Sequence, residues 1–227
     1  MAQRSELGDI DMNFQSLSAA VVGLALLVTP AVIPVLAQEG ANPTTAPEGV
    51  TPSTAELMET TSAAAGKPNL QLPFYCKQKW RLDTWAHAPA LDMVKEPNQE
   101  GTNGATLLAP ASGTVNQSFK HRQAGNVIQI NHGGGWFTTY LHLQSRVARV
   151  GNKVQVGTVI GKVGKTGPTS NNHPHLHFEL GYDSNKDGKA SWGFKGSERV
   201  KPIFNGVTYG SKNGQTRRNV VSYNKCP

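Results

Sequence analysis

Charged residues are scarce in this sequence, and they form no dense basic stripe. Asp, Glu, Lys and Arg make up 16% of the 227 residues, and Arg217-Arg218 is the only adjacent basic pair. The net charge of +7 favours an anionic partner, but the missing stripe argues against nucleic-acid binding. The hydrophobic fraction is modest at 37%, whereas 24 glycines and 14 prolines indicate many turns. This composition suits short strands better than long helices. We expect an all-β, mainly antiparallel fold with long loops.

Cysteine is nearly absent, because only Cys76 and Cys226 occur. In an exported protein, their positions near the two ends of the predicted folded region favour a disulfide bond, with two free thiols as the alternative. Closing so long a loop would stabilise the fold by up to about 5 kcal/mol. A paired Cys76 is not a nucleophile, which disfavours a cysteine-dependent amidase.

The N-terminal segment has no charged residue from Met12 to Gln38, and most of residues 17–37 are Ala, Val, Leu or Ile. The run ends in Val35-Leu36-Ala37, which predicts a signal peptide over residues 1–37 with cleavage after Ala37. A retained membrane anchor is the alternative, because the run is long enough to span a bilayer. In both cases we expect the rest of the chain to be secreted, periplasmic or in the cell envelope.

Residues 38–70 are rich in Ala, Thr, Pro, Ser and Gly and contain few large apolar residues. Such a segment buries too little apolar surface to offset the entropy lost on ordering, so we predict a disordered linker. Residues 71–227 then form one compact β-sheet or β-sandwich domain. Its tail from Trp192 onwards carries no motif, and we expect it to shape a substrate groove.

The clearest chemical signal is the stretch His175-Leu176-His177-Phe178-Glu179-Leu180. In an extended strand, His175, His177 and Glu179 point to one face and the apolar residues to the other. Two imidazoles two residues apart can converge on one metal ion, or one can bind metal while the other handles protons. Glu179 is then either a hydrogen-bond partner behind a ligand or a solvated carboxylate.

Asp92 is a second candidate ligand. Leu91 and Met93 flank it, so Asp92 projects from a strand whose other face is apolar, and His87 lies in the turn just before.

A hairpin supplies another histidine. Gly133-Gly134-Gly135 predicts a turn between strands over residues 126–132 and 136–143. Simple alternation puts Leu141 and Leu143 on one face of the second strand and His142, with Tyr140, on the other. The remaining histidines, His121, His132 and His173, are expected to face solvent or to be structural.

Together these segments resemble the core of the lysostaphin-type (LytM-like, LasA-like) zinc metallopeptidases, over roughly residues 74–182. That family has a β-rich fold and cleaves peptide bonds in peptidoglycan. One spacing differs, because four residues rather than the commoner three separate His87 from Asp92. The matching elements are His87 with Asp92, Tyr140-Leu141-His142-Leu143, residues 151–161, residues 163–167 and His173-Pro174-His175-Leu176-His177-Phe178-Glu179.

The resemblance implies that His87, Asp92 and His177 hold Zn²⁺, with His142 and His175 beside the reacting water. Three protein ligands and one open position suit catalytic zinc, which activates water and polarises the scissile carbonyl. Either His142 or His175 could take the proton. We favour His175 as the general base and His142 as a partner that orients water or stabilises the oxyanion.

The sequence therefore predicts a zinc endopeptidase that hydrolyses peptidoglycan peptides as a monomer and contacts a membrane only if residues 1–37 are retained. The alternative is a non-catalytic cell-wall-binding or regulatory module of the same fold, because the family contains members that lack ligands. The full set of five site residues favours the enzyme.

Overall fold

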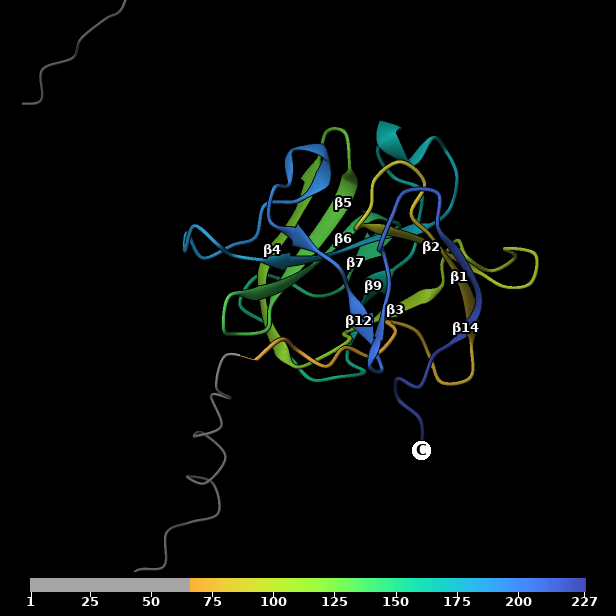
Figure 1. The fold of residues 1–227 in the computed structure, drawn as a ribbon, viewed down its shortest axis with the longest axis horizontal. Coiled ribbons are helices and arrows are strands. Elements are labelled where there is room, and N and C mark those ends of the chain that lie inside the picture. The colour runs from red at the N-terminus through yellow and green to blue at the C-terminus, as the bar shows by residue number, and fades with distance from the viewer. Residues whose placement is uncertain (1–65) are drawn as a thin grey trace, which may run out of the picture. The chain divides into compact units, whose positions relative to one another are not determined.

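The computed structural model describes residues 66–227 (Figure 1). The predicted signal peptide and nearly all of the predicted linker lie outside these residues. Leu70, the last residue of the predicted linker, is buried in the core and its backbone bridges to Phe204. Within residues 66–227, no helix is both long and apolar enough to cross a membrane.

The described residues are almost entirely strands and loops, which confirms the predicted all-β, mainly antiparallel fold. Helical structure among them is limited to two single 3₁₀ turns, η2 (Pro168–Ser170) and η3 (Gly193–Lys195). The strands are β1 (Lys79–Asp83), β2 (Leu91–Lys95), β3 (Thr106–Leu108), β4 (Gly113–His121), β5 (Gly125–Asn131), β6 (Trp136–Leu143), β7 (Ser145–Arg146), β8 (Lys153–Val154), β9 (Val159–Lys162), β10 (Leu176–Tyr182), β11 (Arg199–Val200), β12 (Ile203–Phe204), β13 (Val207–Thr208) and β14 (Thr216–Val221).

The main sheet has the strand order β14-β1-β2-β10-β6-β5-β4-β8, and β11 also pairs with β10. All of these pairings are antiparallel. A three-stranded sheet, β3-β9-β7, and a two-stranded sheet, β12-β13, complete the domain. Strand β10 thus lies between β2, which carries Asp92, and β6, which carries His142.

The core forms on one face of the main sheet, because apolar residues alternate along its central strands. Leu91 and Met93 of β2 pack in the same buried cluster as Leu176, Phe178 and Leu180 of β10. Residues of the three-stranded sheet, among them Leu107 and Ile160, belong to this cluster too. The opposite face of β2 and β10 carries Asp92, His177 and Glu179, together with the apolar Val94.

Strand β6 departs from simple alternation at His142. Its φ of 63° lies in the left-handed region. On the neighbouring strand β5, Ile128 pairs with Tyr140 and Asn126 pairs with Leu143. Two residues of β6, 141 and 142, therefore stand opposite the single residue 127 of β5. This bulge reverses the side-chain alternation. The predicted shared faces are therefore wrong: Tyr140 and Leu143 both pack in the main core, whereas Leu141 and His142 both line a cleft on the other face.

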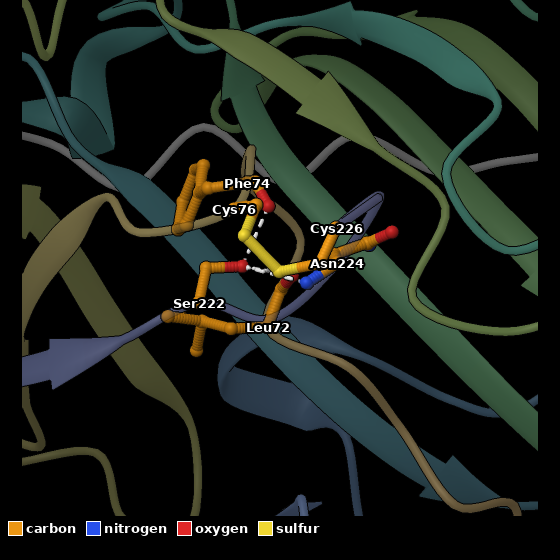
Figure 2. The surroundings of a disulfide bond; sticks show 6 residues. All are labelled: Leu72, Phe74, Cys76, Ser222, Asn224 and Cys226. Atoms are coloured by element: carbon orange, nitrogen blue, oxygen red, sulfur yellow. Dashed lines mark hydrogen bonds between the residues drawn. A yellow bond between two sulfur atoms is a disulfide. The ribbon is translucent and has the colours of Figure 1, made fainter.

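The predicted disulfide bond joins Cys76 to Cys226, with their Cα atoms 5.0 Å apart. Figure 2 shows that Ser222 lies beside it and that the Ser222 hydroxyl contacts the backbone of Leu72 and Phe74, at the start of the domain. This hydroxyl lies 2.6 Å from the carbonyl oxygen of Phe74 and 3.1 Å from that of Leu72. The first and last segments of the domain are thus held together by a covalent bond and by polar contacts.

Candidate metal centre

Strand register brings the predicted ligands together. His177 of β10 stands directly opposite Asp92 of β2 and, on its other side, opposite Leu141 of β6. His87 lies in the turn before β2, where its N–H donates to the Thr84 carbonyl and its own carbonyl accepts from Ala90. The turn accommodates the longer spacing, because it returns His87 to within reach of Asp92.

The Asp92 carboxylate is the centre of the cluster. Its Oδ2 lies 3.2 Å from His87 Nε2, and its Oδ1 lies 3.0 Å from His177 Nδ1. His175 Nε2 is 3.6 Å from the same Oδ1. The rings of His142 and His175 are 4.9 Å apart, centroid to centroid. The structure thus places all five predicted site residues in one cluster.

Burial and hydrogen bonding set the charges of the ligand candidates. Burial by itself raises the pKa of Asp92, but hydrogen bonds with His177 and His87 hold that pKa well below its usual range. Burial lowers the pKa of His177, but hydrogen bonds with Asp92 and Glu179 outweigh it and raise that pKa to about 9. Asp92 is therefore an anion that faces several imidazoles.

The two proton-handling candidates have the opposite electrostatics. Burial, reinforced by the neighbouring His175 and His177, lowers the pKa of His142 to about 4. Burial also lowers the pKa of His175. Both imidazoles are therefore neutral near neutral pH.

Backbone carbonyls select the tautomers of these two rings. His142 Nδ1 donates to the Thr166 carbonyl at 3.0 Å, and His175 Nδ1 donates to the His173 carbonyl at 2.8 Å. Since the Nδ1 proton of each ring is committed to a carbonyl, Nε2 of each neutral ring has a free lone pair. Each ring can accept a proton at that atom.

The cluster lies in a cleft of about 850 Å³ that all five residues line. The tail contributes Trp192, Phe194, Lys195 and Arg199 to its walls, and a role of the tail in substrate binding stays a prediction. His121 and His173 also line the cleft, which their polar sequence surroundings did not indicate. His132 instead contacts the Ser112 carbonyl and the Thr138 hydroxyl at 2.7 and 2.8 Å, so it is structural.

Glu179 and Arg199 complete the surroundings of the cluster. Glu179 is buried rather than solvated, and its Oε1 lies 2.8 Å from His177 Nε2, which decides between the two alternatives for this residue. Arg199 lies 3.8 Å from Glu179 and donates to the His87 carbonyl at 3.4 Å. Sequence reasoning missed Arg199 because its segment contains no motif; only the pairing of β11 with β10 brings it here.

The residues present fit a divalent cation. One nitrogen of each of His87 and His177 and one oxygen of Asp92 lie within 4.8 Å of one another. Two imidazoles and a carboxylate are a ligand set that zinc accepts. Moreover, His87 Nδ1 is buried with no hydrogen-bond partner in the described residues, so the polar groups around this ring are not fully satisfied by the protein.

Known proteins resemble part of this chain. Peptidoglycan DD-endopeptidases ShyC and ShyA of Vibrio cholerae are 38% and 39% identical to it, each over 77 residues. These segments are 34% of this chain but only 17% of either relative, so the chain matches a small part of their length. A solved zinc-containing peptidase from Vibrio cholerae aligns with a TM-score of 0.39 and 27% identity, over 50% of this chain and 37% of that one.

The match to a protein family covers three of the five site residues. Residues 98–190 match the family described as Peptidase family M23. This segment contains His142, His175 and His177, whereas His87 and Asp92 precede it. This chain is therefore similar to peptidase family M23 over that segment, which is less than half of its length.

Proposed function

We propose that this protein is a zinc-dependent endopeptidase of the bacterial cell envelope that hydrolyses peptide bonds in peptidoglycan. The observation that carries the proposal is the convergence of His87, Asp92 and His177 beside the neutral His142 and His175 in an open cleft. The peptidoglycan endopeptidases among the relatives support the substrate class.

In this proposal His87, Asp92 and His177 hold the metal. Bound zinc would supply a Lewis acid that activates water and polarises the scissile carbonyl. Nε2 of His175 has a free lone pair and lies close to Asp92, so His175 accepts the proton of the attacking water. His142, across from His175, orients the water or donates to the oxyanion, and the walls of the cleft hold the peptide.

The decisive experiment measures release of soluble fragments from purified peptidoglycan by the full chain. We expect a chelator to abolish release and added zinc to restore it. His177→Ala should bind no zinc and release no fragments, whereas His132→Gln, outside the cleft, should remain active. Hydrolysis that survives both chelation and His177→Ala would disprove the metal mechanism. A chain that binds peptidoglycan but neither binds zinc nor cleaves would instead be the non-catalytic module.

The substrate bond and the location of the protein can be measured separately. Mass spectrometry of fragments released from defined muropeptides identifies the bond that is cut. N-terminal sequencing of the protein recovered from cells is expected to begin at Gln38. A chain that retains Met1 and partitions with membranes would identify the N-terminal segment as an anchor.

A further inference from the structure

A buried carboxylate stands behind His177. Glu179 follows His177 on the same face of β10, and only 2% of its surface is exposed. Its Oε1 is 2.8 Å from His177 Nε2, and both of its oxygens accept from the Gly193 N–H at 3.0 Å. Both ring nitrogens of His177 therefore face a carboxylate, Nδ1 that of Asp92 and Nε2 that of Glu179. A metal bound at Nδ1 would replace the proton there, and the Glu179 contact would keep the remaining proton on Nε2.

Arg199 connects this carboxylate to the other imidazole ligand. It lies on β11, opposite Gly181 of β10. Its Nη1 is 3.8 Å from Glu179 Oε1 and donates to the His87 carbonyl at 3.4 Å. Its Nε donates to the Gly196 carbonyl at 3.0 Å, in the loop that carries Phe194 and Lys195. One guanidinium thus contacts the turn of His87, the partner of His177 and the rim of the cleft.

We infer that Glu179 and Arg199 are positioning residues that orient His177 and His87 for metal binding, an inference that rests on the proposed zinc site. Glu179 fixes which nitrogen of His177 faces the ligand cluster. Arg199 neutralises the buried carboxylate and holds the His87 turn at a set distance from β10. Because its planar guanidinium donates to two carbonyls and also lies beside the Glu179 carboxylate, a lysine cannot replace it fully.

The first test measures the zinc affinity of the full chain by competition with a chromogenic chelator. Replacing a residue that hydrogen-bonds to a metal ligand typically weakens metal binding by about 10–100-fold, and we expect a weakening of that size for Glu179→Ala. Arg199→Met should also weaken zinc binding. The zinc affinity of Arg199→Lys should lie between those of Arg199→Met and the unaltered chain. The matched control is Arg218→Met, which removes an arginine paired with Glu96 on the protein surface. Its zinc affinity should not change.

A second measurement needs no variant. Nitrogen-15 NMR of the zinc-loaded chain should show that His177 carries its remaining proton on Nε2. A proton on Nδ1 would overturn the inference. Folded Glu179→Ala and Arg199→Met proteins with unaltered zinc affinity would also overturn it while leaving the proposed enzyme intact. If the unaltered chain bound no zinc, both the proposed function and this inference would fall.

Discussion

At the scale of single residues, the ligand candidates and the proton-handling candidates differ in what their ring nitrogens contact. His142 and His175 each donate Nδ1–H to a backbone carbonyl, whereas His177 has a carboxylate at each nitrogen. The first arrangement leaves a basic nitrogen free, and the second holds a ligand in one orientation. Identical side chains therefore serve different proposed roles because their partners differ.

Substitution should separate these roles. We expect His142→Ala and His175→Ala to bind zinc but to hydrolyse peptidoglycan about 10²–10⁴-fold more slowly, the usual contribution of general acid–base catalysis. Zinc content after purification and the rate of fragment release are the two measurements. If either variant lost its zinc, that histidine would be a ligand rather than a proton carrier.

At the scale of elements, a carboxylate organises the connection between β10 and β11. Glu198 accepts hydrogen bonds from the backbone N–H groups of Ser191, Ser184 and Asn185. These bonds, the one from Ser191 foremost, lower the pKa of Glu198 to about 2. Since the same connection carries Trp192 and Phe194 into the cleft wall, Glu198 contributes to the shape of the cleft.

The lowered pKa of Glu198 has a consequence for stability. The pKa of Glu198 is lower in the folded chain than its ordinary value of 4.5. Ionised Glu198 therefore stabilises the fold fully at pH values above 4.5, and this stabilisation disappears as the pH falls towards about 2. Urea unfolding should show Glu198→Gln to be less stable than the unaltered chain at neutral pH, with the difference shrinking in acid. A difference that is constant across this range would contradict the assignment.

The turn η3 presents an apolar side chain to the cleft. Phe194 is 86% exposed and lines the cleft. We expect Phe194→Ala to raise KM by roughly tenfold with little change in kcat, because it removes about 1–2 kcal/mol of binding without touching the reacting groups. Tyr223→Ala is the control, since Tyr223 is also exposed but does not line the cleft. A fall in kcat at constant KM would argue against a binding role.

At the scale of the whole molecule, one covalent bond closes nearly all of the described chain into a loop. Cys76 and Cys226 are 150 residues apart in sequence. The double variant Cys76→Ser/Cys226→Ser should lose about 2–5 kcal/mol of unfolding free energy in urea. Hydrolysis by the disulfide-bonded chain should resist thiol alkylation, and inactivation by alkylation would instead support a cysteine nucleophile.

The all-β class, the glycine hairpin, the disulfide partners and the common face of His175, His177 and Glu179 could all be predicted before the structure was known. These features depend on composition, on a single possible cysteine pair or on strict alternation within one strand. None of them depends on the register between strands that lie far apart in the chain.

The assembly of the site, in contrast, became visible only in the folded chain. The register of β10 against β2 sets His177 opposite Asp92, and the bulge in β6 turns His142 and Leu141 to the same side. The β11 pairing brings Arg199 to Glu179 and to the His87 carbonyl. Strand register and bulges depend on contacts between segments far apart in the chain, so no local pattern encodes them.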